Sequence, residues 1–285
     1  MQFLNFELNG QRGLAVLDGQ SFKGLLASDA GFPGTLHDLL VKGEGALAQA
    51  GEALRKGPAI DLAKIAYLPP LENPRAIWCI GLNYADHSVE SGFAVPTYPA
   101  IFSRFSSSLI GHNASVVRPK VSKQLDFEGE MVAVIGKAGK YIAKENALDH
   151  VAGYSIFNDA SIRDYQMKSG QWTIGKNFDN TGPFGPVFVT ADELPPGAAG
   201  LKIQTRLNGV VVQDASTSSL IFDVATLVSQ LSEAMCLQPG DVIVTGTPSG
   251  VGMARNPQLW MKAGDVCEIE IEGIGILRSP VVDEA

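Results

Sequence analysis

The chain has 285 residues, of which 45% are hydrophobic and 18% are charged. This composition supports a large core and excludes disorder over most of the length. Lys plus Arg number 22 against 30 Asp plus Glu, a formal net charge of −8, and no block of basic residues occurs. Nucleic acid and anionic membrane surfaces are therefore not expected as partners.

The cysteines and the apolar runs indicate the cellular compartment of the protein. Cys79, Cys236 and Cys267 are far apart and odd in number, which argues against a disulfide framework. The first residues show no cationic leader, and no apolar run approaches the roughly 18 residues that a membrane span requires. The sequence therefore predicts a cytoplasmic protein that does not enter a membrane.

Residues 1–70 are predicted to form a small N-terminal α/β domain. Residues 1–10 alternate apolar and polar side chains as a half-buried strand does, and the next ten predict a second strand. From Thr35 onward apolar residues recur at helical spacing, until a Pro-rich stretch at residues 68–74 ends the pattern. We place the boundary near residue 70, which leaves residues 71–285 as a larger second domain.

The second domain is predicted to be rich in strands. Its β-prone runs are residues 77–80, 100–102, 131–135, 187–190, 201–207, 242–244 and 266–271. Asn208-Gly209 predicts a hairpin turn, and few helices are expected, the clearest at residues 220–235 and two others at residues 147–151 and 161–167. Strands without regularly alternating helices favour a β-dominated α+β fold over a doubly wound parallel sheet.

The segment at residues 126–130 contains three acidic residues at alternate positions. In a strand, Asp126, Glu128 and Glu130 would point to one side, and from this spacing alone a charged outer face is as good an explanation as a site. The run continues into Val132 and its apolar neighbours as a buried strand, however, so the crowded acids would require a cation. Oxygen ligands favour Mg²⁺, Mn²⁺ or Ca²⁺ over Zn²⁺.

A second polar cluster follows the apolar run at residues 151–157. Asp159 is positioned either to cap a helix or to complete an oxygen triad with Glu128 and Glu130. Arg163 and Gln166 would lie on the same face of that helix.

His87 and Glu90 are three residues apart and would meet on one helical turn. A carboxylate beside an imidazole fixes its tautomer and raises its basicity, as a water-activating base requires, although most such pairs are exposed surface pairs.

Two glycine-containing segments are weaker signals. Residues 170–176 resemble a phosphate-binding loop, but Asn177 replaces the expected Ser or Thr, so nucleotide binding is rejected. Residues 246–252 have the wrong spacing for a dinucleotide loop, yet could present backbone amides and Thr247 to an anion.

Five motifs occur in the order found in one family: Asn-Tyr-Ala-Asp-His-x-x-Glu, Asp-Phe-Glu-x-Glu, Asn-Asp-x-Ser-x-Arg-Asp, Gly-Lys-Asn-Phe-Asp and Thr-Gly-Thr-Pro-Ser-Gly-Val-Gly. From Asn73 to Pro280 the chain resembles the fumarylacetoacetate hydrolase family, in particular its 2-hydroxyhepta-2,4-diene-1,7-dioate isomerase and acylpyruvate hydrolase types. Phe127 and Ser161 replace a frequent Tyr and a frequent Thr.

This resemblance implies a mixed β-sandwich roll, a homodimer and a site that holds Mg²⁺ or Mn²⁺. The residues that it assigns are the metal ligands Glu128, Glu130 and Asp159, the catalytic residues His87, Glu90 (paired on a mobile lid) and Lys176, and the substrate-binding residues Arg104, Arg163, Gln166 and Thr247.

The resemblance also implies the reaction. We expect a metal-dependent hydrolase that cleaves a carbon–carbon bond in a small 2,4-dioxo acid such as an acylpyruvate or fumarylpyruvate, in catabolism of aromatic compounds or sugar acids. An isomerase or decarboxylase of a related oxo acid at the same site is the alternative. A non-catalytic Ca²⁺-binding module is less consistent with the cations and the histidine beside the acids.

The crowding of the acids carries an expectation about stability. Removing any one of Glu128, Glu130 or Asp159 should relieve repulsion and leave the metal-free fold intact or improved.

Overall fold

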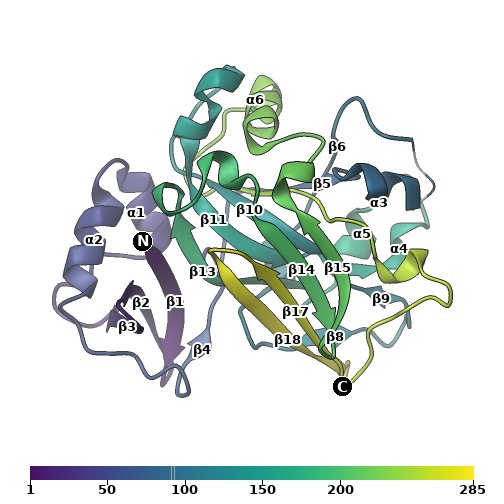
Figure 1. Cartoon of the computed structure of the whole chain (residues 1–285). Helices are drawn as coiled ribbons and strands as arrows, with labels where there is room; N and C mark the ends of the chain where they lie inside the picture. The colour runs from purple at the N-terminus through teal and green to yellow at the C-terminus, as the bar shows by residue number, and fades with distance from the viewer. Residues whose placement is uncertain (91, 93) are drawn as a thin grey trace.

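The computed structural model describes residues 1–90, 92 and 94–285, and its largest element is an 11-stranded mixed sheet (Figure 1). The main path of this sheet runs β3-β2-β1-β13-β11-β10-β16-β5-β6, with β4 paired to β1 and β7 paired to β13. Its strands are β1 (Gln2–Leu8), β2 (Gln11–Asp18), β3 (Ser21–Leu26), β4 (Ala66–Tyr67), β5 (Ile77–Gly81), β6 (Ala100–Ser103), β7 (Leu109–Ile110), β10 (Gly129–Ile135), β11 (Val151–Asn158), β13 (Gly182–Thr190) and β16 (Val242–Val244).

A second sheet of five strands lies in front of the first in the view of Figure 1, in the order β15-β14-β17-β18-β8. Its strands are β8 (Val116–Arg118), β14 (Lys202–Leu207), β15 (Val210–Ser216), β17 (Val266–Ile271) and β18 (Gly275–Asp283). The predicted hairpin at Asn208-Gly209 is confirmed, since these residues join β14 to β15 with φ angles of 51° and 78°. Two consecutive residues with positive φ are what a type I′ turn requires.

A short two-stranded ladder joins β9 (Leu125–Asp126) to β12 (Ser161–Ile162). It corrects the prediction of a helix over residues 161–167, because Ser161 and Ile162 pair with β9 and only Arg163–Gln166 are helical.

The helices are short and lie around the sheets. They are α1 (Leu36–Lys42), α2 (Ala46–Leu54), α3 (Ala85–Glu90), α4 (Arg163–Gln166), α5 (Thr173–Lys176) and α6 (Val224–Ala234), with 3₁₀ turns at Ser106–Ser108, Lys144–His150, Ala191–Glu193, Pro196–Ala198, Thr217–Ser219 and Gly252–Ala254. The helix predicted at residues 220–235 begins later, at Val224, because the Asp223 side chain caps it by accepting from the Thr226 amide. The helix predicted at residues 147–151 is a 3₁₀ turn that precedes β11.

The main core lies between the two sheets, and β10 is buried on both faces. Met131, Ala133 and Ile135 face the core that includes residues of β14 and β17, whereas Val132 and Val134 face a second cluster. That second cluster extends to α1 and α2, which cover the other side of the large sheet at its N-terminal end. Polar side chains on β10 are consequently held away from water.

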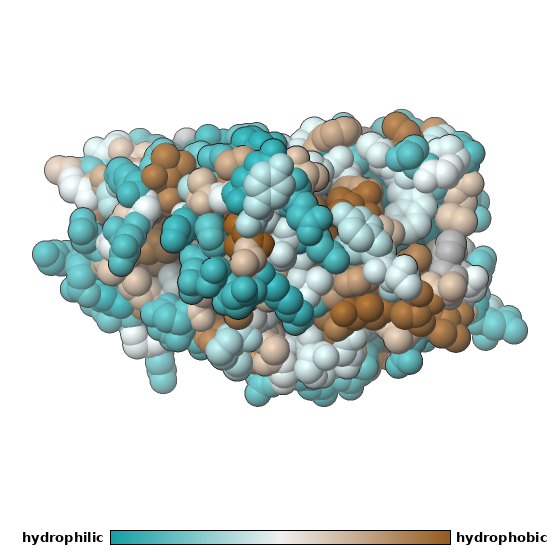
Figure 2. Space-filling view, turned by 90° about the horizontal axis from the view of Figure 1, so that it is seen from above, coloured by the Kyte–Doolittle hydropathy of each residue, from teal (hydrophilic) through white to brown (hydrophobic). Residues whose placement is uncertain are grey.

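The N-terminal strands continue the large sheet, because Gln2 and Phe3 of β1 pair with Val189 and Phe188 of β13. The domain boundary near residue 70 stays a prediction. The face seen from above in Figure 2 carries a mixture of polar and apolar residues, with the largest apolar group at the lower right. No helix among the described residues is long and apolar enough to cross a bilayer.

Candidate active site

The site is set by the pairing of two neighbouring strands. In the antiparallel ladder between β10 and β11, Gly129 pairs with Asn158, and the Asp159 amide donates to the Glu128 carbonyl at 2.9 Å. This register places Asp159 beside Glu128 and Glu130, although about thirty positions separate them in the chain. The three side chains, on which the sequence analysis placed a metal, are brought together and buried.

Each of these three residues, which we call the acidic triad, offers a carboxylate oxygen within 4.8 Å of the others. The Lys176 ammonium lies among them, with Nζ 2.6 Å from Glu128 Oε2 and 2.6 Å from Asp159 Oδ2. Arg163 adds a second cation, its Nη2 lying 2.7 Å from Glu128 Oε1. Two of the three acids are therefore neutralised by buried cations.

The charges affect the members of the acidic triad differently. Burial acts to raise the pKa of Glu128, but Lys176 and Arg163 outweigh it and lower that pKa below its ordinary value. Burial, with repulsion from Asp159 and Glu128, holds the pKa of Glu130 well above its ordinary value. Among the described residues no cationic side chain is paired with Glu130, whose carboxylate accepts from the Gly246 amide. Glu130 is thus the acid with uncompensated charge.

The acidic triad fits a divalent cation. All of its ligand atoms are carboxylate oxygens, which suits Mg²⁺ or Mn²⁺ better than a thiolate-seeking metal. A raised pKa at Glu130 is the mark of a carboxylate that lacks positive charge, and a bound cation would supply that charge. Glu128, Glu130 and Asp159 are the residues that would hold it.

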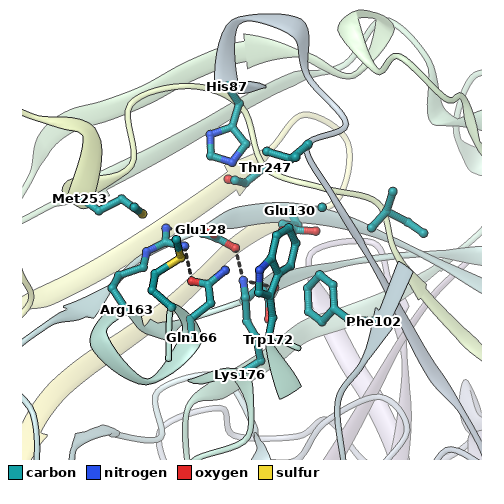
Figure 3. Close-up of a pocket in the computed structure, with 15 residues that line it drawn as sticks. His87, Phe102, Glu128, Glu130, Arg163, Gln166, Trp172, Lys176, Thr247 and Met253 are labelled. Carbon is teal, nitrogen blue, oxygen red and sulfur yellow. Dashed lines mark hydrogen bonds and ion pairs between the residues drawn. The ribbon is translucent and has the colours of Figure 1, made fainter. Parts of the chain in front are cut away.

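His87 lies above the acidic triad, on α3, with Lys176 on the opposite side of the pocket (Figure 3). Its Nδ1 is 3.0 Å from Glu90 Oε1. Glu90 also accepts from the Gly250 amide, at 2.9 Å to each of its oxygens. The carboxylate therefore orients the imidazole and attaches α3 to the loop at residues 246–253, and it does not line the pocket itself.

That loop binds the protein's own acids. The Gly246 amide donates to Glu130, the Gly250 amide to Glu90, and the Gly252 and Met253 amides to Asp126. From the sequence alone, backbone amides and Thr247 of this segment could equally face an external anion. The amides named here instead hold three side chains of the site.

The pocket combines polar and apolar walls. The predicted residues that line it are His87, Glu128, Glu130, Asp159, Arg163, Gln166, Lys176 and Thr247. The Thr247 hydroxyl donates to the Gly129 carbonyl and accepts from Gln213, so it has little free capacity for a substrate. The apolar lining, which no sequence motif indicates, includes Phe102, Met167, Trp172 and Met253. Trp172 lies within residues 170–176, the segment that was rejected as a phosphate-binding loop.

Two residues lie away from their expected positions. Arg104 is not on the pocket wall: its side chain is fully buried beneath Asp159, with Nη1 2.5 Å from Oδ1 and Nη2 2.8 Å from Thr181 Oγ1. Its side chain supports a member of the acidic triad, and contact of Arg104 with a substrate stays a prediction. Asp126 is separated from Glu128 by the end of β9, and it accepts from Arg163 Nε at 2.8 Å.

Comparison with known proteins gives the family. Residues 76–282 match the family model described as the C-terminal domain of fumarylacetoacetate hydrolase. The chain belongs to the fumarylacetoacetate hydrolase family. Over 273 residues it is 42% identical to mitochondrial oxaloacetate tautomerase fahd2 of Xenopus laevis, a match that covers 95% of this chain and 85% of the relative.

Solved structures of the family agree with the fold. The fumarylacetoacetate hydrolase of Exiguobacterium antarcticum superposes with a TM-score of 0.87 at 35% identity, over 100% of both chains. The maleylpyruvate hydrolase of Sphingobium sp. SYK-6, solved with manganese(II) and pyruvate, gives 0.82 at 28% identity over 100% of both chains. The predicted α+β family fold is confirmed.

The difference between Glu130 and Glu128 predicts opposite stability effects in chelator. A raised folded-state pKa means that Glu130 stabilises the fold below its unfolded pKa and that this contribution is lost as pH rises towards the folded value. Near neutral pH, Glu130→Gln should therefore unfold several degrees above wild type, with the gap widening as pH rises. Glu128→Gln takes one carboxylate away from each of two buried cations, Lys176 and Arg163, which keep Asp159 and Asp126 as partners, and should lose about 1–3 kcal/mol. This replaces the expectation that all three variants would be alike.

Calorimetric melting of the three proteins checks this. Excess Mg²⁺ or Mn²⁺ should raise the wild-type midpoint by mass action and barely move either variant. A Glu130→Gln protein that melts below wild type in chelator, or equal metal shifts in all three, would contradict the assignment.

Arg104 should act on metal affinity through Asp159. Residues that support a metal ligand typically contribute a factor of about 10–100 in affinity. Arg104→Lys, which keeps the charge but replaces the two guanidinium nitrogens that bond Asp159 and Thr181 with a single ammonium, should weaken Mn²⁺ binding by about that factor in titration calorimetry. Arg118→Lys at the exposed Asp283 pair is the control, and equal affinities in the two variants would refute this role.

Proposed function

We propose that the protein is a divalent-metal-dependent tautomerase of oxaloacetate or a closely similar short 2-oxo acid. The reaction moves one proton between C3 and the oxygen of C2, which interconverts the keto and enol forms. The observation that carries the proposal is the placement of one histidine and one acidic triad on opposite sides of a single small pocket. Its best support outside the structure is the 42% identity to an oxaloacetate tautomerase over nearly the whole chain.

His87 is positioned as the base. Because Glu90 is bonded at Nδ1, that nitrogen carries the proton and Nε2 keeps a lone pair that can accept the C3 proton. The proton leaves C3 as its bonding electrons delocalise onto the C2 oxygen, and it returns to that oxygen to give the enol. When bound, the divalent cation supplies Lewis-acid stabilisation of negative charge on the substrate oxygens.

The cations of the pocket orient the acid. Arg163 Nη2 is buried and, among the described residues, forms no hydrogen bond of good geometry, although it lies close to Glu128. The guanidinium group of Arg163 lines the pocket, and such a group is well suited to bind a substrate carboxylate. Gln166, which accepts from Arg163 Nη1 at 2.8 Å, keeps its own amide donors for the substrate. Lys176 lies at the other end of the pocket, where its ammonium would stabilise the negative charge on the enolate oxygen.

The test is the decay of enol-oxaloacetate, followed by its ultraviolet absorbance in the presence of Mn²⁺. Wild type should accelerate the approach to equilibrium, and chelator should abolish the effect. His87→Ala should lower kcat by about 10²–10⁴, the range for loss of a general base. His37→Ala, which changes an exposed histidine on α1, should match wild type. A chelated enzyme with full activity would overturn the proposal.

Hydrolytic cleavage of an acylpyruvate is the second candidate. The His87–Glu90 pair favours it, since such a pair also activates water, and a structural relative is a maleylpyruvate hydrolase. Product analysis by NMR separates the reactions. Two carboxylic acids from an acylpyruvate would establish hydrolysis, release of CO₂ from oxaloacetate would establish decarboxylation, and recovery of the isomers alone supports the tautomerase.

We also propose a homodimer. Its support is the presence of exposed apolar side chains such as Phe105, Met167 and Ile174 on this chain. Light scattering at micromolar concentration should give twice the chain mass.

Cytoplasmic location stays a prediction, since the Xenopus relative is named mitochondrial.

A further inference from the structure

We propose that Trp172 limits the length of the acid that the pocket accepts, and that the absence of a side chain at Gly81 allows the indole of Trp172 to occupy its position. This inference rests on the proposed function, because it concerns the chain of a 2-oxo acid held at the acidic triad. Neither residue was assigned a role by its motif.

The indole of Trp172 lies in close contact with the backbone of β5. A Cβ atom built on Gly81 would lie 2.3 Å from Cζ3 and 2.9 Å from Cη2 of the indole. Real Cβ atoms do not approach ring carbons so closely, so any other residue at position 81 would displace the ring. Glycine is required here because of space, and it allows the indole to lie directly on the strand.

Phe102 completes the wall. Its ring packs edge-on against Trp172, with centroids 5.5 Å apart and an interplanar angle of 70°. The same Phe102 ring lies 5.0 Å from Lys176 Nζ, the ammonium that joins Glu128 and Asp159. The aromatic wall therefore begins immediately beyond the cation at the acidic triad.

The two ends of the pocket differ in chemistry. In Figure 3, Arg163 and Gln166 lie on one side of Glu128, and Trp172 and Phe102 lie on the other. An acid that places its carboxylate towards Arg163 directs the rest of its chain towards the aromatic wall. The substrate atoms furthest from the carboxylate are those that meet the indole.

The space before this wall is small. The cavity has a volume of about 40 Å³, room for only a few water molecules. Trp172 is not a core residue, since it is only half-buried and lines the cavity. In the orientation inferred above, each added methylene is therefore directed against the indole. A pocket of this kind discriminates by about tenfold or more per methylene.

The experiment compares binding of pyruvate, 2-oxobutyrate and 2-oxohexanoate to the Mn²⁺-loaded protein by titration calorimetry. Wild type should bind the acids progressively more weakly as the chain lengthens. Trp172→Ala should bind 2-oxohexanoate relative to pyruvate about tenfold or more better than wild type does. Trp172→Phe should fall between the two, and Tyr141→Ala, which removes an exposed aromatic residue outside the pocket, should behave as wild type.

The outcomes separate this inference from the proposed function. An unchanged order of affinities in Trp172→Ala, with a melting midpoint that shows a folded protein, overturns the length limit. If Trp172→Ala does not fold, Trp172→Leu provides the same comparison. A wild type that binds these acids with the predicted length dependence but does not tautomerise oxaloacetate would refute the proposed function and leave the role of Trp172 standing.

Discussion

The burial of three carboxylates within 4.8 Å of one another is the constraint on which the rest of the site depends. Such crowding is unfavourable without positive charge, and the protein provides it unevenly. Lys176 and Arg163 pair with Glu128, and Lys176 and Arg104 pair with Asp159, while Glu130 accepts from a backbone amide and, within the part of the chain that the structure describes, has no cationic partner. Glu130 lacks compensating positive charge, and a divalent cation would supply that charge. The stability of the folded protein and the chemistry of the site therefore depend on the same three carboxylates.

Backbone amides of the loop after β16 also contribute to the charge balance of the site. Its amides satisfy Glu130, Glu90 and Asp126, which come from three different segments of the chain. Hydrogen bonds to an ionised carboxylate are among the stronger ones in proteins, so this loop fixes the positions of the acidic triad, of α3 and of Arg163 relative to one another. Gly250 has a φ of 103°, and a Cβ there would meet the Val212 carbonyl at 2.1 Å, which restricts this position to glycine.

Much of this could be predicted from the sequence, and the exceptions have physical reasons. The spacing of Glu128 and Glu130 on a strand with a buried continuation indicated a metal site, and the second polar cluster offered Asp159 either as a helix cap or as the third ligand. The family motifs then assigned Asp159 as a ligand. The position of Arg104 could not be predicted, because its partner, Asp159, is 55 positions away in the chain and becomes a neighbour only in the folded protein. Asp126 was expected beside the other acids because period-two reasoning assumes a continuous strand, and β9 ends there. The aromatic wall carries no charge pattern, so only the packing on Gly81 reveals it.

Glu90 determines both the position and the protonation of the base. One carboxylate both orients the His87 imidazole and accepts from the Gly250 amide. Because His87 and Glu90 lie on the same helix, a movement of α3 away from the loop would carry the pair together and break only the contact with Gly250. The contact with the loop therefore fixes where the base lies above the acidic triad, whereas the contact within α3 fixes which of its nitrogens carries the proton.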